Sequence, residues 1–208
     1  MIWSIEALQL DLRYLWKISR NATDTKTNLI VTVSDGKRSA QGEAAPNIRY
    51  DETPDKLLKE FSSFTSAIGD DEPDHRSLLD LIRSLDLSHA LSFAIESAYV
   101  HYLAGKIKQS VHSFLDIPPA PSPIPVSYTI PIMDPAAMKV FYGEEKLQRF
   151  PFVKLKVNAE SAFECVNYLM SFTQNPVMVD ANEGFKDVDD AIRFLEKVKK
   201  LPLVLVEQ

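Results

Sequence analysis

Two lysines in the second half of the chain stand in a pattern that is typical of a β-strand. Lys154 and Lys156 alternate with valine and leucine in the segment 152–157. Side chains of a strand alternate between its two faces, so both lysines share one face and the apolar residues share the other. Ammonium groups on an inward face are costly unless carboxylates or a ligand compensate them. The segment is therefore a candidate site, although paired lysines on a strand are more often a solvated face.

Two acidic residues end the next two strand-like segments. Asp180 ends the segment 177–180, and Glu207 follows the segment 203–206. Lys156 and Asp180 are 24 residues apart, and Asp180 and Glu207 are 27 apart. A strand–helix–strand repeat takes roughly 30 residues, so all three groups are expected at the carboxyl ends of neighbouring parallel strands. In a β/α barrel that rim is where active sites are built.

The elements that would position these groups alternate regularly from residue 126 onward. The pattern predicts strands at 126–130, 152–157, 177–180 and 203–206. It predicts helices between them at 135–148, 160–172 and 188–199. Alternation of this kind favours a parallel sheet.

The first part of the chain has a different pattern. Extended segments at 2–19, 28–33 and 39–43 predict a small antiparallel sheet, with a polar, turn-like segment at 20–26 and a hairpin turn at Asp35-Gly36. Apolar residues at helical spacing then predict helices at 54–68, 74–85, 88–105 and, shorter, 107–114.

A proline-rich segment separates the two patterns. Five prolines stand between Ile117 and Pro125, where they can neither continue a helix nor fit a central strand. We therefore predict an α+β domain at 1–117, a linker at 118–125 and β/α units at 126–208.

Composition excludes some classes of function. The 208 residues carry a formal net charge of −6 without a long basic stretch, which argues against nucleic acid as a partner. No segment has the length and apolarity of a membrane helix, and no signal peptide is evident. The single cysteine, Cys165, indicates a reducing compartment and is expected to be a small buried side chain. A cytoplasmic protein is predicted.

Several segments together resemble the enolase superfamily, in its muconate-lactonizing-enzyme-like branch (the mandelate racemase/muconate lactonizing enzyme group). The resemblance covers the whole chain. Ile18-Ser19-Arg20 and the strand 127–130 favour the dipeptide epimerases, which invert the second residue of dipeptides such as Ala-Glu. The remaining segments that carry the resemblance are 28–33, 42–46, 93–98, 105–106, 154–156, 180–182 and 207–208.

The resemblance implies an α+β capping domain and a modified, TIM-like β/α barrel, here only its first four β/α units. It implies Mg²⁺ held by three carboxylates, of which Asp180 and Glu207 match the first two. Lys156 matches the acid/base lysine, and Lys154 matches its partner. Arg20 and Thr129 match positions that contact the substrate, a small carboxylate and most closely a dipeptide. A homo-oligomer is also expected.

The implied reaction removes a proton α to a carboxylate. Such a proton is very weakly acidic, so the enediolate needs strong electrostatic stabilisation, which a divalent cation supplies. Oxygen ligands suit Mg²⁺. A lysine acts as a base only when its pKa falls toward neutrality, and a neighbouring ammonium group favours that fall.

The sequence also departs from the family pattern. The third carboxylate ligand of the family lies on the fifth strand, the opposing lysine on the sixth and a specificity motif on the eighth, whereas this sequence ends at Gln208. Asn158 replaces the usual glycine after the lysine motif, and His101 replaces an aspartate. Muconate cycloisomerisation and o-succinylbenzoate synthesis, which share the same half-site, stay open. So does an inactive, truncated fragment that lacks the third ligand and the second lysine.

Residue by residue, simpler roles stay open as well. Asp180 could cap a helix, and Glu207 could belong to a frayed terminus. Arg20 in a polar loop is often solvated, and Thr129 on a strand often serves packing alone. The structure must therefore decide which of these side chains meet.

Overall fold

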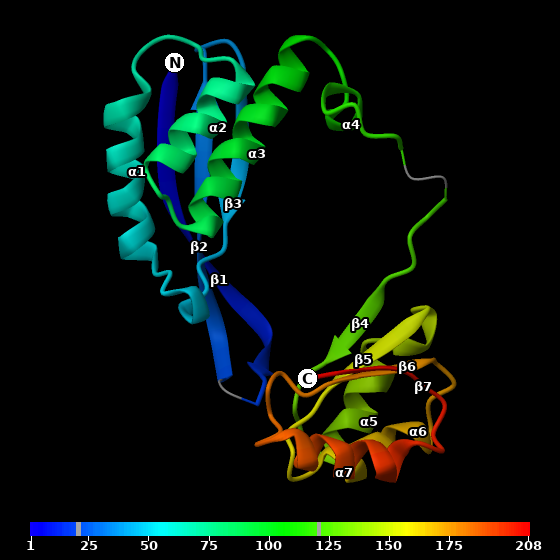
Figure 1. The fold of residues 1–208 in the computed structure, drawn as a ribbon. Coiled ribbons are helices and arrows are strands. Elements are labelled where there is room, and N and C mark those ends of the chain that lie inside the picture. Colours follow the sequence, from blue (N-terminus) through cyan, green and yellow to red (C-terminus); the bar gives the residue numbers. More distant parts are fainter. Residues whose placement is uncertain (20–21, 120–121) are drawn as a thin grey trace. The chain divides into compact units, whose positions relative to one another are not determined.

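The computed structural model describes residues 1–19, 22–119 and 122–208, and it divides into two compact units (Figure 1). The first, here called the α+β unit, comprises Met1–Asp11 and Thr25–Pro119. The second, the parallel-sheet unit, comprises Leu12–Asp24 and Ala120–Gln208. The long strands β1 (Ile2–Lys17) and β2 (Ala22–Ser34) therefore contribute to both units.

The α+β unit contains a sheet in the order β1-β2-β3, where β3 spans Ser39–Ala44. Strands β2 and β3 are antiparallel and pair from Leu29 with Ala44 to Ser34 with Ser39. The hairpin turn between them forms where the sequence predicts it. Asp35 Oδ1 accepts hydrogen bonds from the backbone N–H groups of Lys37 and Arg38, each at 2.7 Å.

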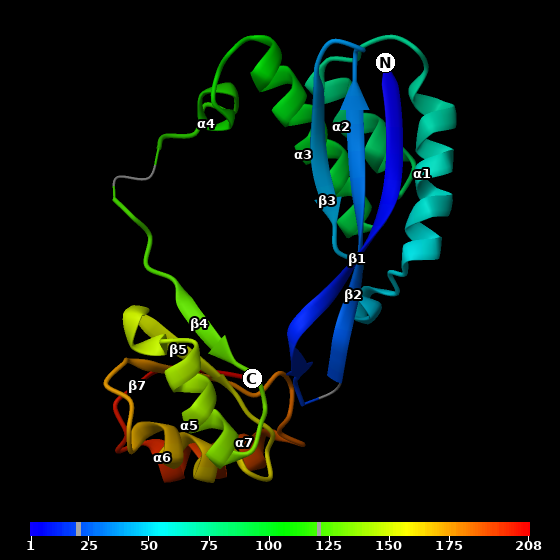
Figure 2. The same cartoon turned by 180° about the vertical axis from the view of Figure 1, so that it is seen from behind.

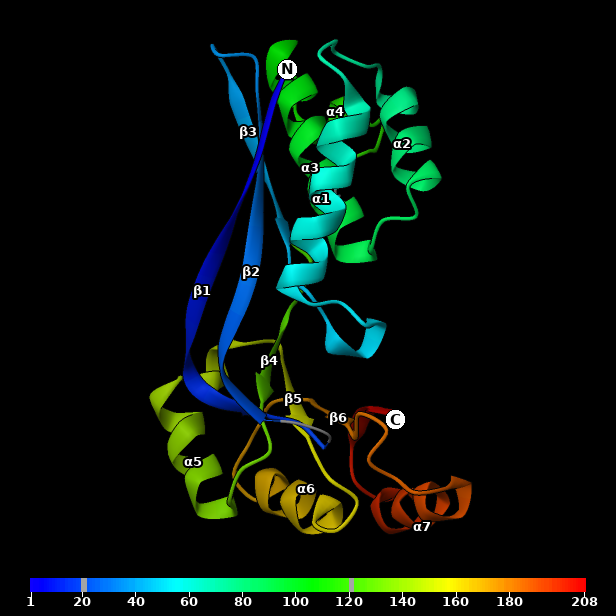
Figure 3. The same cartoon turned by 90° about the vertical axis from the view of Figure 1, so that its left-hand side faces the viewer.

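Helices cover one face of this sheet (Figures 2 and 3). They are α1 (Pro54–Ile68), α2 (His75–Ser84) and α3 (His89–Lys106), with a 3₁₀ turn at Ile48–Tyr50. The short helix α4 (Val111–Phe114) packs against α3. Helix α3 lies so close to β3 that a Cβ atom on Gly42 would be 2.1 Å from the carbonyl oxygen of Ala94. Glycine is therefore required at the contact between this helix and the sheet.

The parallel-sheet unit contains a sheet in the order β4-β5-β6-β7, with all neighbouring strands parallel. The strands are β4 (Ser127–Ile130), β5 (Phe152–Lys156), β6 (Val177–Asp180) and β7 (Leu203–Glu207). Helices cover one face of it in Figure 3: α5 (Pro135–Glu144), α6 (Ala162–Met170) and α7 (Val188–Val198), with a 3₁₀ turn at Leu147–Arg149.

Apolar side chains of β5 and β6 form the core beneath these helices. Val153, Leu155, Val177 and Val179 are fully buried in one cluster, and Cys165 of α6 is buried in the same cluster. The fold class predicted from the sequence, an α+β domain with the first β/α units of a barrel, is confirmed. Within the described residues, no helix is long and apolar enough to cross a membrane.

Three elements differ from the prediction. The helix expected at 135–148 ends at Glu144, because the backbone at Lys146 turns into the left-handed region with φ 52° before a separate 3₁₀ turn. The helix expected at 107–114 forms only over Val111–Phe114. The segment 22–26, expected as a turn, is already part of β2, which is hydrogen-bonded to β1. Polar side chains are compatible with a strand here because this part of β2 is largely exposed.

Candidate active site

The two lysines of β5 meet one carboxylate of β6. Lys156 is directly opposite Asp180 in the parallel register, and its Nζ donates to Asp180 Oδ2 at 2.6 Å. Lys154 Nζ lies 2.7 Å from the same oxygen. It also donates to Glu207 Oε2 of β7 at 2.7 Å. The structure therefore brings together four of the six side chains that the sequence singles out.

The sheet explains why these charges converge. Alternation along β5 turns Val153 and Leu155 toward the helices, where both are fully buried, and turns the two lysines to the opposite face. Parallel pairing then places Asp180 beside Lys156 and Glu207 beside Asp180. The cluster lies at the carboxyl ends of three adjacent strands, which is the rim predicted from the spacing.

Burial varies across the cluster. The Asp180 side chain is 1% exposed, while those of Lys156, Lys154 and Glu207 are 12%, 23% and 50% exposed. The shared carboxylate is thus desolvated, and the cluster opens to solvent on the side of Glu207. Because little water screens the charges around Asp180, this carboxylate and the two ammonium groups interact strongly.

These contacts set the direction of two pKa shifts. Burial raises the pKa of the Asp180 carboxyl group, but hydrogen bonds from Lys154, Lys156 and the backbone N–H of Asn182 outweigh it, and the pKa lies below the ordinary 3.8. Desolvation lowers the pKa of Lys154, but bonds to Asp180 and Glu207 outweigh it, and the pKa lies above the ordinary 10.5. A neighbouring ammonium group favours a lower pKa, yet the two carboxylates decide the direction at Lys154.

The turn after β6 holds Asp180 from a third side. The backbone N–H of Asn182 donates to Asp180 Oδ1 at 2.9 Å, and its side-chain amide donates to Oδ2 at 3.3 Å. Asn182 and Glu183 both adopt left-handed backbone conformations, with φ of 48° and 60°. Such residues are uncommon outside turns and functional sites. The signal in the sequence was the asparagine two residues after Asp180, a residue type that tolerates this conformation.

Of the two remaining candidates, one lies beside the cluster on the adjacent strand and the other lies outside the described residues. Thr129 of β4 pairs with Lys154 in the parallel register and is partly buried. It lines a cavity of about 250 Å³ together with Tyr14 and Trp16. Arg20 lies outside the described residues. Its neighbour Ser19 donates from Oγ to the backbone carbonyl of Asn182 at 2.8 Å, a contact that sequence reasoning missed.

Asp180 and Glu207 are suited to hold a small cation between them. Both carboxylates contact the same ammonium group, Lys154 Nζ, so their oxygens already converge on one positive charge. Such a donor set, with oxygen atoms only, fits Mg²⁺. Within the described part of the chain, no group of three or more His, Cys, Asp or Glu side chains has the arrangement of a metal site. The two carboxylates could therefore supply only part of the oxygen ligands of a Mg²⁺ ion.

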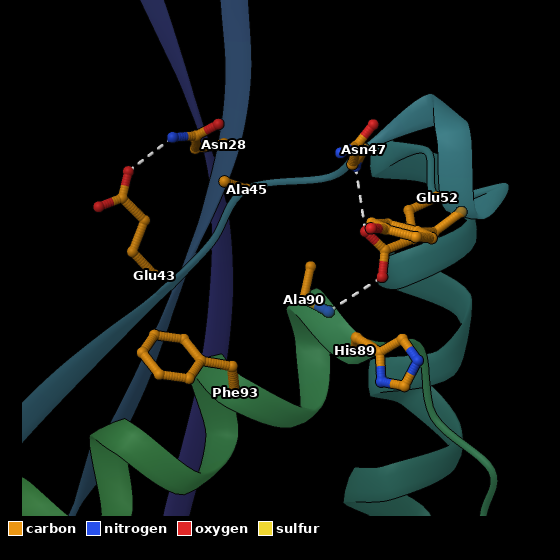
Figure 4. A pocket seen from close by; sticks show the side chains of 9 residues that line it. Asn28, Glu43, Ala45, Asn47, Glu52, His89, Ala90 and Phe93 are labelled. Carbon is orange, nitrogen blue, oxygen red and sulfur yellow. Dashed lines mark hydrogen bonds between the residues drawn. The ribbon is translucent and has the colours of Figure 1, made fainter. Parts of the chain in front are cut away.

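A second cavity, of about 620 Å³, lies on the α+β unit (Figure 4). Its buried carboxylate, Glu52, accepts hydrogen bonds from the backbone N–H groups of Asn47 and Ala90, and Glu43 accepts one from Asn28. These acidic side chains therefore hold the start of α3 and the sheet edge in place, as the dashed lines in Figure 4 mark. We assign no chemistry to this cavity.

Comparison with curated proteins agrees with the resemblance predicted from the sequence. No protein-family model matches the chain. It is 25% identical over 201 residues to an L-Ala-D/L-amino acid epimerase of Flavobacterium johnsoniae, covering 96% of this chain and 58% of that protein. It is 22% identical over 201 residues to an L-Ala-D/L-Glu epimerase of Bacteroides thetaiotaomicron, covering 96% of this chain and 52% of that protein. The chain thus spans between half and three fifths of these relatives' length.

Solved structures share the fold. The L-Ala-D/L-Glu epimerase of Bacillus subtilis, in a substrate-liganded complex, superposes with a TM-score of 0.87 at 19% identity, over 100% of this chain and 60% of that chain. A dipeptide epimerase of Enterococcus faecalis, complexed with Mg and L-Leu-L-Tyr, gives 0.87 at 19% identity, over 99% and 60%. A muconate lactonizing enzyme of Pseudomonas fluorescens gives 0.80 at 21%, over 99% and 59%. The resemblance to dipeptide epimerases of the enolase superfamily is confirmed, and the likeness to a muconate lactonizing enzyme is a likeness of fold.

Proposed function

We propose that the protein containing this chain is an isomerase of the enolase superfamily that removes the α-proton of a carboxylate substrate, and that its substrate is a dipeptide of the Ala-Glu type. The observation that carries the proposal is the convergence of Lys154, Lys156, Asp180 and Glu207 at the carboxyl ends of β5, β6 and β7. Curated relatives that are epimerases support the choice of reaction.

Lys156 is the proposed base. Its side chain is 12% exposed, so a substrate bound against the rim would exclude most of its remaining water. Its Nζ is held at 2.6 Å from Asp180, which fixes the direction from which it approaches the substrate. Lys154, whose pKa is raised by its carboxylate partners, is suited to remain an ammonium group and to bind negative charge on the substrate.

Asp180 and Glu207 are the proposed ligands of Mg²⁺. When bound, the metal supplies positive charge to the carboxylate of the substrate. The same two carboxylates accept hydrogen bonds from the lysines, so they tie the position of the base to that of the ligand pair. A homologous epimerase of Enterococcus faecalis is complexed with Mg and a dipeptide, which supports this assignment.

Thr129 and Arg20 are the proposed contacts to the rest of the substrate. Thr129 lies opposite Lys154 on the adjacent strand, which gives its hydroxyl group the same face of the sheet. Arg20 follows Ser19 in the sequence, and Ser19 is bonded to the turn that holds Asp180. A guanidinium group suits a dipeptide carboxylate.

Muconate cycloisomerisation is the second candidate. It is favoured by one observation, the fold similarity to a muconate lactonizing enzyme that is complexed with muconolactone. It ranks lower because the curated relatives are epimerases of dipeptides. The chain spans 52% to 60% of those relatives, so turnover is to be measured on the complete protein.

The deciding experiment follows the α-proton. The protein is incubated with L-Ala-L-Glu and Mg²⁺ in D₂O, and proton NMR records loss of the Cα–H signal of the second residue and appearance of the epimer. Lys156→Ala is expected to reduce the exchange rate by about 10²–10⁴-fold, the usual contribution of a general base. Lys199→Ala, which removes an exposed surface lysine, is the matched control. Equal rates for the Lys156 variant and the wild type would contradict the assignment.

A further inference from the structure

The second half of β1 packs against the parallel-sheet unit, and it carries contacts that the proposed chemistry does not use. We refer to Leu12–Ser19 as the arm. It belongs to the parallel-sheet unit although the strand begins in the other unit. Figure 3 shows β1 bending beside α5 before the strand ends. Three contacts fasten the arm, and they follow one another along the chain.

The first contact is a buried carboxylate at the end of α5. Glu145 accepts hydrogen bonds from the hydroxyl groups of Tyr14 at 2.5 Å and Tyr128 at 2.9 Å. The guanidinium group of Arg13 pairs with it at 3.0 Å. The Glu145 side chain is only 6% exposed. We call Glu145 with Arg13, Tyr14 and Tyr128 the clasp.

The location of Glu145 indicates that it stabilises the position of the arm and does not stabilise its own helix. It occupies the C-cap of α5, where the helix dipole disfavours a negative charge. Its pKa is nevertheless lowered, first by the hydrogen bond from Tyr14 and then by that from Tyr128. Two of its three partners, Arg13 and Tyr14, come from the arm. A buried carboxylate in an unfavourable place is thus stabilised mainly by the segment that it fastens.

The second and third contacts lie further along the arm. The backbone N–H of Ile132, just after β4, donates to the carbonyl oxygen of Lys17 at 3.0 Å. Ser19 Oγ donates to the carbonyl oxygen of Asn182 at 2.8 Å. Gly184 leaves room for this contact, since a Cβ atom there would lie 3.2 Å from that of Ser19 and 2.8 Å from the Ala181 carbonyl oxygen.

The order of the contacts gives the arm a direction. The first contact lies at Tyr128 within β4, the second at Ile132 beyond the end of β4, and the third at the turn after β6. That turn holds Asp180 through the backbone and side-chain nitrogens of Asn182. The arm therefore runs toward the carboxyl-end rim and ends beside the candidate active site. None of the lysines or carboxylates of the site is supplied by the arm.

We propose that the Glu145 clasp and Ser19 are positioning elements that hold the end of the arm at the rim, and thereby set the affinity for substrate independently of the proton-transfer groups. The part of this inference that concerns substrate rests on the proposed function. Because Lys154, Lys156 and Asp180 are held by the sheet itself, loosening the arm raises KM and leaves kcat nearly unchanged. A general loss of stability would not separate the two constants in this way.

The test compares Tyr14→Phe, which keeps the ring on Phe141 but removes the hydroxyl donor, with Tyr168→Phe in the same unit. Hydrogen–deuterium exchange with mass spectrometry follows three segments, 12–19, 130–133 and 181–185. Tyr14→Phe and Glu145→Gln are expected to increase exchange in all three by several-fold, whereas Tyr168→Phe leaves them unchanged. Ser19→Ala is expected to increase exchange mainly at 181–185. Unchanged exchange at 181–185 in all the variants overturns the inference.

Kinetics then tests the consequence for substrate. With a dipeptide that the wild type turns over, Tyr14→Phe is expected to raise KM about 5- to 20-fold with kcat within about twofold. Changes confined to kcat would overturn the positioning role. If the wild type turns over no dipeptide, the proposed function fails, while the exchange experiment still decides whether the clasp holds the arm.

Discussion

Lys156 Nζ donates to Asp180 Oδ2 at 2.6 Å, from one parallel strand to the residue directly opposite it on the next. The same oxygen lies 2.7 Å from Lys154 Nζ, so one carboxylate with 1% exposure is shared by two ammonium groups. Any group that engages Asp180 therefore changes the contacts of both ammonium groups at once.

Neutralising the shared carboxylate is expected to lower the pKa of Lys154. Asp180→Asn removes one of the two carboxylates at 2.7 Å from Lys154 Nζ, so desolvation and the second ammonium group should lower the pKa of Lys154 relative to the wild type. Titration of the lysine side chains by heteronuclear NMR measures the shift. Glu207→Gln is the matched control and should have a smaller effect, because Glu207 is 50% exposed. A larger shift with Glu207→Gln would contradict the account.

Mg²⁺ is expected to compete with Lys154 for its two carboxylates. Addition of Mg²⁺ should therefore shift the NMR signals of the Lys154 side chain and lower its pKa, because its stabilising partners become engaged elsewhere. Asp180→Ala and Glu207→Ala should each weaken Mg²⁺ binding at least tenfold in calorimetry. Glu196→Ala, at an exposed ion pair on α7, should leave it unchanged.

The Glu145 clasp is expected to make the free energy of unfolding depend on pH. The folded-state pKa of Glu145 lies below the ordinary 4.5, so its contribution is fully present above that value and is lost as pH falls through the folded-state pKa. Wild type should therefore exceed Glu145→Gln in unfolding free energy at neutral pH, and the difference should shrink as pH falls below 4.5. Chemical denaturation at several pH values measures it. A difference in unfolding free energy that grows as pH falls would contradict a lowered pKa of Glu145 in the folded state.

Two glycines offer a matched test of the α+β unit. Gly42→Ala would place a Cβ atom 2.1 Å from a backbone carbonyl oxygen of α3, so it should lower the unfolding free energy by about 1–3 kcal/mol or more. Gly105→Ala, within α3 and with no atom beyond the surrounding helix backbone within 4 Å of the new Cβ, should raise it by about 0.5–1 kcal/mol. Urea denaturation of both variants measures the two effects. Equal stabilities would show that α3 can move away from β3 at little cost.

Much of the fold and of the candidate site could be predicted because short-range rules decide them. Alternation in 152–157 places both lysines on one face, and the spacing of one β/α unit brings Asp180 and Glu207 to the same rim. The strongly periodic strands and most helices follow from the same local patterns. These relationships need only the neighbouring residues and the regular geometry of parallel strands.

Other features depend on contacts between distant parts of the chain. Tyr14 and Glu145 are 131 residues apart, and Ser19 and Asn182 are 163 apart. No local pattern marks Glu145 as buried, since glutamate at the end of a helix is ordinarily exposed. The early end of α5 depends on the left-handed Lys146, a conformation that lysine rarely adopts. The grouping of Leu12–Asp24 with the parallel sheet follows from such contacts.

This grouping has a consequence for modularity. The chain passes between the two units within β1, within β2 and again at the proline-rich segment, so neither unit is contiguous in sequence. A cut or a genetic crossover in 118–125 would leave Glu145 on one piece and Arg13 and Tyr14 on the other. Exchange of either unit between homologues would therefore have to transfer the arm together with residues 126–208. The proline-rich segment is therefore one of three places at which the chain passes between the units.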